Sequence, residues 1–421
     1  MNATKRILFV GLALMITACT PTEKIIERQS SNDNPVRKIE VQDDMDAEQM
    51  ALAGEQLLSV WNFMLADKVF NWSLSKDPTN KRAQFYSALL KPIMVTKGLA
   101  VRLRPYYRNN GGTQSLDNNL ERLPNSSLKA FLLDGTEDIK DLKDVQNLLV
   151  QERDAWNDLR KFLIANQTMN LVLNMNPMTF QDQVNKGMSD KCKIEEDNDH
   201  NVIVTCDYAH AFEKKVNVAD LLALRQMAAS YVLGLSLYTS YSVDGIENLL
   251  KMDQKNMSEQ QRIEFVEHEL PAAAKLRKDH SLSLIPDLGS DFLSAAKWVI
   301  QYQQNLCPQS TKPSSIKRPG YLMDGESFCI KDLAKAQQDL VIFESALHGP
   351  ISVVLTTKEN IKKSTQVNYL ALITKPVEDL RSLAPSSYSA CGKAATLRDK
   401  TMGGTFPLAD AEDFNIEKCR N

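Results

Sequence analysis

The sequence has no excess of charge of one sign and few histidines. Its 421 residues include 50 lysines and arginines, 53 aspartates and glutamates, and five histidines. This balance offers no basic patch for a polyanion, so we expect no nucleic-acid partner. In the body of the chain, no apolar run is both long and clean enough to span a bilayer, which takes roughly 20 residues.

The sequence also lacks the short motifs that carry common enzyme chemistry. It has no G-x-S-x-G, no P-loop and no G-x-G-x-x-G. The acidic turn before His200 lacks the central glycine of a calcium loop, and the acidic residues around His268 have no matching second carboxylate–histidine motif. Both are typical of solvated surface charge. We therefore predict a non-catalytic protein with no metal and no cofactor.

The N-terminus has the order of features found in export signals. Lys5 and Arg6 precede an apolar run, and Ile16-Thr17-Ala18-Cys19 follows. This tetrapeptide resembles the lipobox of bacterial prolipoproteins, which implies removal of residues 1–18 and lipidation of Cys19. The run is too short for a transmembrane anchor, and an ordinary secretory peptide needs no cysteine at the cut. In the resembled family, an aspartate after the cysteine retains the protein at the inner membrane. Thr20 therefore favours the outer membrane, on either face.

Six further cysteines form an even set, which suits an oxidising compartment. Strand-like alternation on both sides of Asp199 predicts a β-hairpin at 191–207, in which Cys192 faces Cys206 and Ile194 faces Val204. No C-x-x-C accompanies the cysteines, so we favour disulfides over a metal site. The expected sequential pairs are Cys192/Cys206, Cys307/Cys329 and Cys391/Cys419, although six cysteines allow 15 connectivities.

The pattern of the remaining chain predicts a mainly α fold. Residues 19–45 are polar and predict a disordered tether. Residues 46–306 are expected to form a helical domain that contains the hairpin. Residues 307–421 are expected to form an irregular C-terminal region that is cross-linked by disulfides. Apolar residues at three- and four-residue spacing predict a long helix over Asp138–Met175, and a second helix, apolar nearly all round, over Val218–Val243. Further helices are expected near 258–268, 290–306 and 331–347, and a strand over Ile351–Leu355.

One segment carries a repeat-like signal. Gly54, Ala66, Phe70 and Pro78 stand at spacings that resemble the tetratricopeptide repeat, whose 34-residue unit pairs two helices. Met50 replaces the usual tryptophan of that family. We expect folding to begin near Ala47, small residues to let two antiparallel helices approach, and Phe70 to fill the gap between them. A generic helical hairpin remains the alternative, because Lys91-Pro92 is expected to interrupt a second unit.

An exposed loop after the repeat-like segment is the predicted interaction site. It combines two arginines with two tyrosines, which are favoured at protein interfaces. Together these features predict a lipoprotein held in the outer membrane through Cys19 that binds another envelope protein. The alternative is an envelope enzyme or small-ligand binder acting on peptidoglycan, lipid or peptide. The predicted interaction residues are Arg104, Tyr106, Tyr107 and Arg108.

Overall fold

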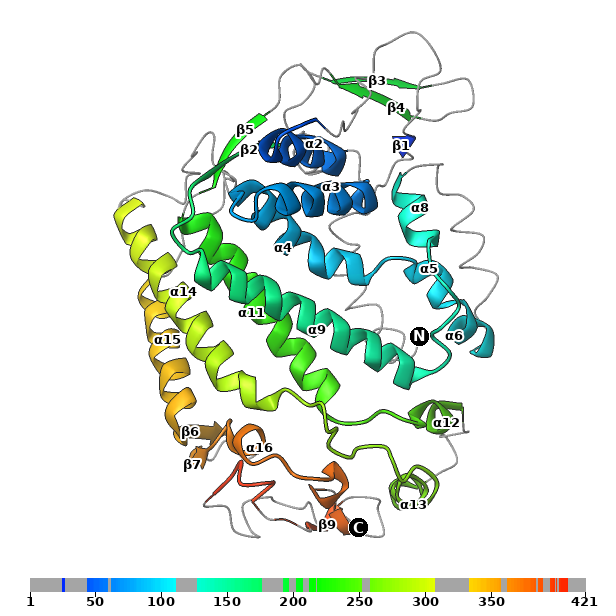
Figure 1. Cartoon of the computed structure of the whole chain (residues 1–421). Coiled ribbons are helices and arrows are strands. Elements are labelled where there is room, and N and C mark those ends of the chain that lie inside the picture. The colour runs from blue at the N-terminus through cyan, green and yellow to red at the C-terminus, as the bar shows by residue number, and fades with distance from the viewer. Residues whose placement is uncertain are drawn as a thin grey trace. The chain divides into compact units, whose positions relative to one another are not determined.

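The computed structural model describes residues 25–26, 44–59, 62–110, 127–175, 192–196, 202–206, 212–216, 218–251, 258–306, 333–356, 362–383, 385–388, 394–397, 399 and 401–407. Helices predominate among them, as the sequence predicts, and the strands form small separate sheets (Figure 1). The chain divides into two compact units. Of the described residues, the first unit holds those before 138 and those of Thr168–Asn217, and the second holds the others.

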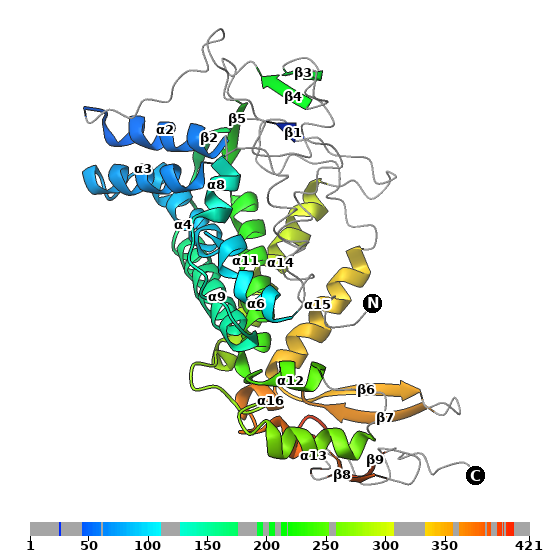
Figure 2. The ribbon, with the colours of Figure 1, turned by 90° about the vertical axis from the view of Figure 1, so that its right-hand side faces the viewer.

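The first unit begins with three helices that form consecutive hairpins (Figure 2). They are α2 (Ala47–Ser59), α3 (Phe63–Lys76) and α4 (Lys81–Val95). Asn62 and Asn80 cap α3 and α4, because each side chain accepts a hydrogen bond from a first-turn backbone N–H. The first helix begins at Ala47, where folding was expected to begin. Pro92 lies near the C-terminus of α4, where the loss of one backbone hydrogen bond leaves the helix intact to Val95. The second repeat-like unit is nevertheless interrupted, as expected, because the two helices that follow α4 are short.

Gly54 sets the distance between α2 and α3. A Cβ atom at this position would lie 2.7 Å from Cε1 of Phe70. Ala66 and Phe70 are fully buried, and the Phe70 ring stacks on Tyr86 of α4 with 5.1 Å between centroids. Small residues and Phe70 therefore have the packing roles that the sequence predicts.

A buried polar cluster joins α2 to α4. Glu55 accepts hydrogen bonds from Arg82 Nη1 and from the Tyr86 hydroxyl, each at 2.6 Å. Arg82 also donates from Nε to Glu48 at 2.8 Å. Burial, followed by the charge of Glu55, raises the pKa of Tyr86 well above its usual value. The cluster pairs each buried charge and thereby fixes how α4 lies against α2.

The rest of the first unit consists of short elements. After α4, the helices are too short to complete a second repeat-like pair, and three-stranded and two-stranded sheets follow in order β1-β4-β3 and β2-β5. In the β3–β4 hairpin Cys192 lies opposite Cys206 and Ile194 opposite Val204, which confirms the predicted register. Strand β1 lies within the segment expected to be a tether. The elements are α5 (Leu99–Arg102), α6 (Arg104–Asn109), α8 (Ser127–Leu133), β1 (Ile25–Ile26), β2 (Leu171–Met175), β3 (Cys192–Glu196), β4 (Val202–Cys206) and β5 (Phe212–Val216).

The long helix predicted over Asp138–Met175 is shorter at both ends. Helix α9 (Leu142–Ala165) begins after Asp141, whose side chain accepts a hydrogen bond from Asp144 N. It ends before Asn166, and the last residues of the predicted range form β2, which pairs with β5. The prediction failed there because Leu171-Val172-Leu173 continues the apolar spacing, whereas pairing with a distant strand decides the structure.

Helix α9 lies in a layer of helices with α11 (Val218–Ser240), α14 (Ile285–Leu306) and α15 (Leu333–His348), which confirms all four predicted positions (Figure 1). Successive helices of this layer are in contact.

By length and composition, residues Asp220–Ser240 of α11 also qualify as a membrane span, with a mean hydropathy of 1.2. Asp220 is fully buried and Arg225 is ion-paired to α14, but only 33% of this span is buried, so the predicted core position holds for one face of the helix. Short helices α12 (Ile246–Lys251), α13 (Glu259–Glu269) and η3 (Leu282–Leu284) connect α11 to α14.

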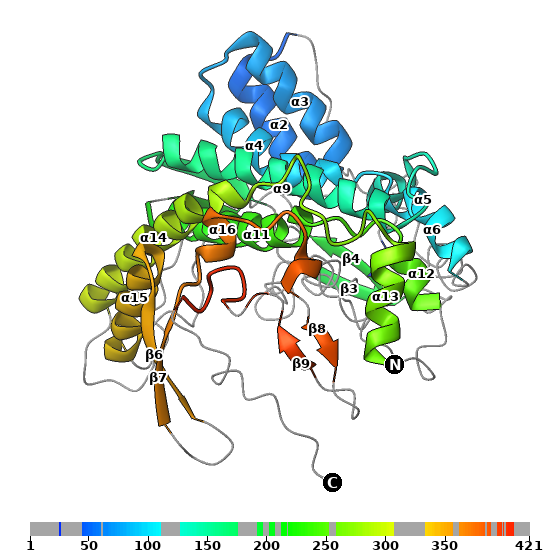
Figure 3. The ribbon, with the colours of Figure 1, turned by 90° about the horizontal axis from the view of Figure 1, so that it is seen from below.

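The C-terminal part of the second unit is more regular than expected. The predicted strand is present in the antiparallel β6–β7 hairpin, and a second hairpin, β8–β9, follows (Figure 3). The prediction of an irregular region is therefore wrong for the residues of these two hairpins. The described residues 401–407, which include Gly403 and Gly404, form turns after β9, so the irregular prediction holds for that stretch. The elements are β6 (Ile351–Thr356), β7 (Lys362–Val367), α16 (Ala371–Thr374), η4 (Leu380–Leu383), β8 (Pro385–Tyr388) and β9 (Ala394–Leu397).

Candidate functional site

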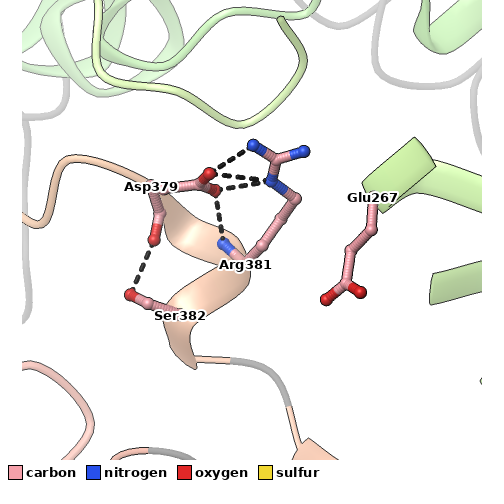
Figure 4. A pocket seen from close by; sticks show the side chains of 4 residues that line it. All are labelled: Glu267, Asp379, Arg381 and Ser382. Atoms are coloured by element: carbon pink, nitrogen blue, oxygen red, sulfur yellow. Dashed lines mark hydrogen bonds and ion pairs between the residues drawn. The ribbon is translucent and has the colours of Figure 1, made fainter. Parts of the chain in front are cut away.

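An open pocket lies in the second unit between α13 and η4 (Figure 4). Its lining residues are Glu267 of α13 and Asp379, Arg381 and Ser382 at η4, and its volume is about 330 Å³. Figure 4 shows the Arg381 guanidinium turned toward Asp379, with Glu267 on the opposite wall. Two carboxylates and one guanidinium therefore line a shallow, open pocket.

The backbone around Asp379 is held in place from a distant segment. Lys275 forms an isolated β-bridge with Asp379, and Leu380 N donates to Ala274 O at 3.0 Å. Ala274 itself has a φ of 64°, a left-handed conformation that a residue other than glycine seldom adopts. Asp379 Oδ1 accepts a hydrogen bond from Arg381 N, as in an Asx turn. These contacts fix the turn that carries the pocket's charged side chains.

Arg381 and Asp379 form a fork-shaped ion pair. The arginine donates from Nε to both carboxylate oxygens at 2.8 Å and from Nη2 to Oδ2. The hydrogen bond from Arg381 lowers the pKa of Asp379, and the same bond raises the pKa of Arg381. Both groups therefore stay charged at neutral pH, and neither is poised to exchange a proton there. The pair is suited to binding a polar group rather than to acid–base catalysis.

A second polar cluster is sealed inside the helical layer. Asp291 of α14 is bonded by Arg160 Nε of α9 at 2.7 Å and by Arg225 of α11. Burial lowers the pKa of Arg160, and burial followed by the charge of Arg160 lowers that of Arg225. The shared carboxylate offsets the burial of two guanidinium groups and links three helices through one side chain.

Glu152 is a buried acid of α9. It is 3% exposed, and neither carboxyl oxygen has a hydrogen-bond partner among the described residues. Burial alone raises its pKa to about 8. One turn further along α9, Trp156 stacks on Tyr231 of α11 with 4.4 Å between centroids. The carboxyl group is therefore largely protonated at neutral pH. Because it is buried, we expect it to affect the stability of the fold rather than to contact a substrate from solvent.

The four residues predicted to form an interaction loop lie instead on or at the edge of helix α6. Pro105 at the start of the helix and the backbone bonds from Tyr107 N to Leu103 O and from Asn110 N to Tyr107 O favour helix over loop. Arg108 Nη1 lies 2.8 Å from Glu137 Oε2, and burial raises the pKa of Tyr107. The loop prediction for Arg104, Tyr106, Tyr107 and Arg108 is therefore wrong, while their role at an interface stays a prediction.

The predicted modification sites are mostly beyond the described part of the chain. Cys19, Cys307, Cys329, Cys391 and Cys419 lie outside it, so their lipidation and pairing stay predictions. For Cys192 and Cys206 the strand register is described and places them opposite each other. Within the described residues, no group of three or more histidine, cysteine or acidic side chains is arranged to hold a metal ion.

Sequence reasoning placed Glu267 among surface charges and did not single out Asp379 or Arg381. Glu267 and Asp379 are more than a hundred residues apart in the chain. An isolated D-x-R triplet is too common in sequences to indicate a site. Glu152 was hidden because it falls on the stripe of an amphipathic helix at a position where an apolar residue is expected. Comparisons of the chain with protein-family models, with curated proteins and with solved structures found no match.

Proposed function

We propose that this chain is a bacterial lipoprotein, anchored in the outer membrane through a lipidated Cys19, that acts without catalysis by binding another envelope protein. The export-type N-terminus and the lipobox-like tetrapeptide support the anchor. The even set of remaining cysteines supports an oxidising compartment. A lipid on Cys19 would hold the helical body at the membrane, where its partner is expected.

The observation that carries the binding role is the placement of apolar side chains on helix surfaces. Trp72 on α3 is 38% exposed, and the Lys68 ammonium lies 4.7 Å from its ring centroid. Leu237 and Tyr238 on α11 are exposed as well. The described pocket, in contrast, is shallow, and its arginine is bonded to an aspartate of the same wall. Exposed apolar helix faces favour a protein partner over a small substrate.

The hairpin of α2 and α3 supports a repeat-like surface. The approach of Phe70 to Gly54 matches the packing that the tetratricopeptide-like spacing implies. Since α5 and α6 are only four and six residues long, we assign one such unit followed by a single further helix rather than an array. This pair and the first turns of α4 form the part of the first unit proposed to meet the partner.

Disulfides belong to the same proposal. Directly opposed residues of an antiparallel pair have Cα separations within the range that a disulfide spans, and Cys192 and Cys206 are opposed in this way. We assign a bond to this pair, and sequential bonds Cys307–Cys329 and Cys391–Cys419 to the others. Such bonds would close loops in a chain exposed to an oxidising envelope.

Cross-linking in cells tests the partner directly. A photoreactive residue at Trp72 is expected to yield a reproducible adduct with one envelope protein, and the same residue at Gln151, exposed on α9 of the second unit, serves as the control. The absence of any reproducible adduct at Trp72 across growth conditions would count against protein binding.

A small-ligand role is the alternative, and the pocket at Arg381 favours it. Glu267 and Arg381 would receive opposite ends of a zwitterionic fragment such as a short envelope peptide. Binding of peptidoglycan fragments by calorimetry, lost in Arg381→Ala and kept in Arg108→Ala, would support this alternative over the first.

A further inference from the structure

Strand β1 joins the segment that was expected to be a tether to the β3–β4 hairpin of the same unit. Ile25 lies opposite Val202 and Ile26 lies opposite Ile203, in a parallel pairing. The order of the sheet is β1-β4-β3, so β4 is paired on both of its sides (Figure 1). The two residues of β1 are therefore fixed to the body of the first unit through backbone hydrogen bonds.

The composition of β1 explains why these two residues pair. Ile25-Ile26 is the only pair of adjacent β-branched residues between Cys19 and Ala47. Strand β4 is itself β-branched over its first four residues, and such side chains suit the pleated surface of a sheet. An isolated two-stranded hairpin is at best marginally stable in water, and a third strand adds the support that it needs. Strand β1 supplies that strand and covers part of the open edge of β4.

This pairing shortens the reach of the chain from the proposed lipid. Cys19 and Ile25 are six residues apart, whereas Cys19 and Ala47, where the first helix begins, are 28 residues apart. A fully extended chain spans at most about 3.3–3.6 Å per residue, so the reach is roughly 20 Å to β1 and roughly 95 Å to α2. A body attached only at Ala47 could stand far from the membrane, whereas a body attached at Ile25 could not.

We propose that β1 acts as a strap that holds the β3–β4 hairpin within about 20 Å of the membrane surface when Cys19 carries its lipid. The hairpin is then the part of the first unit that lies next to the lipid headgroups. The residues between β1 and Ala47 connect the sheet to α2 and do not add to the distance between lipid and body. The strap rests on the proposed lipidation of Cys19, whereas the pairing of β1 with β4 does not.

The pairing is tested by cross-linking within one molecule of the full chain. A photoreactive residue at Ile26 is expected to form an adduct with residues of β4, which peptide mapping identifies. The same residue at Asp46, exposed just before α2, is the control and should form no adduct with β4. A probe at Ile26 that never reaches β4 overturns the inference, whether or not Cys19 is lipidated.

The strap is tested by energy transfer between the hairpin and the lipid headgroups. The purified lipidated chain carries a donor fluorophore at Glu196, the last residue of β3. It is bound to vesicles of phosphatidylethanolamine and phosphatidylglycerol in which some headgroups carry an acceptor. Strong transfer is expected for the wild-type chain, because the hairpin lies within reach of the headgroups.

Replacing both isoleucines of β1 with aspartate should release the strap. In the Ile25→Asp, Ile26→Asp variant the attachment extends to the start of α2, so transfer is expected to fall at least about twofold. The matched control is Ile39→Asp, Val41→Asp, which makes the same charge change in the same segment outside β1 and should keep the wild-type transfer. Both variants should keep the helical circular dichroism of wild type, because β1 contributes no helix.

The outcomes separate the strap from the proposed function. A lipidated wild-type chain with transfer no higher than that of the Ile25→Asp, Ile26→Asp variant overturns the strap and leaves the anchor standing. A wild-type chain without lipid overturns the proposed anchor, and with it the position of the hairpin at the membrane, while the adduct at Ile26 still reports the pairing.

Discussion

At the scale of single residues, two glycines inside helices show opposite environments. Gly54 lies against the Phe70 ring, whereas Gly234 faces open space. Sequence spacing identified the role of Gly54 because its partner follows 16 positions later in a recognisable pattern. The setting of Gly234 depends on which helices flank α11, which the local pattern does not contain.

Alanine at each glycine is expected to change stability in opposite directions. Gly54→Ala forces the Phe70 ring to move and should lower the free energy of unfolding by about 1–3 kcal/mol. Gly234→Ala should raise it by roughly 0.5–1 kcal/mol, because helix propensity is the main effect in the monomer. Urea unfolding of both variants checks the pair, and equal signs would contradict the packing at Gly54.

Glu152 gives the protein a pH dependence of known sign. Its pKa is raised to about 8 from a usual 4.5, so the folded chain binds more protons than the unfolded chain between these values. The free energy of unfolding therefore falls as pH rises from about 4.5 to 8, and levels off above. Glu152→Gln should remove this slope and gain about 2–4 kcal/mol at pH 8.5 relative to wild type.

Unfolding curves at pH 5, 7 and 8.5, followed by hydrogen exchange in α9, measure this effect. Asp158→Asn on the exposed side of the same helix is the control and should keep the wild-type slope. Parallel pH profiles for wild type and Glu152→Gln would show that Glu152 ionises normally in the folded chain.

At the scale of elements, helices were predicted well and their ends less so. Periodicity located α9, α11, α13, α14 and α15, and α9, α11 and α14 bury apolar residues such as Leu159, Val232 and Leu288. The C-terminal end of α9 was missed because β2 owes its strand form to β5, some forty residues later. The register of β3 against β4 was predicted to the residue pair, since only five polar residues separate the two strands in the sequence.

Two arginine–glutamate pairs in the first unit differ in burial and should differ in energy. Arg82→Met leaves Glu55 buried without its guanidinium partner and is expected to cost about 3–5 kcal/mol. Arg108→Met breaks the exposed contact with Glu137 and should cost at most about 1 kcal/mol. Urea unfolding of the two variants measures both costs, and hydrogen exchange in α2 and α4 locates the effect of Arg82→Met. Similar effects of the two variants would show that the Glu55 cluster does not hold these helices together.

The β3–β4 hairpin carries a prediction about covalent structure. Peptide mapping without reduction is expected to recover Cys192 linked to Cys206, because the register places them opposite each other. A linkage of either cysteine to a different partner, or free thiols at both in protein isolated from an envelope, would contradict the pairing.

At the scale of the whole molecule, the order of the chain does not follow its units. The chain leaves the first unit after Glu137, returns at Thr168 and leaves it again after Asn217. No change of composition marks these crossings, so the sequence gives no sign of them. The pocket at Arg381 was missed for the same reason, since α13 and η4 meet only through the folding of the second unit.

The proposed function rests on the predicted lipid anchor in the outer membrane more than on any other feature, and substitution of Cys19 tests it most directly. Cells expressing the full chain are labelled with a palmitate analogue and fractionated. Wild type is expected to carry the label and to remain with the outer membrane, whereas Cys19→Ala loses the label and appears in the soluble fraction. An unlabelled wild-type chain, or a Cys19→Ala chain still bound to the membrane, would contradict the account.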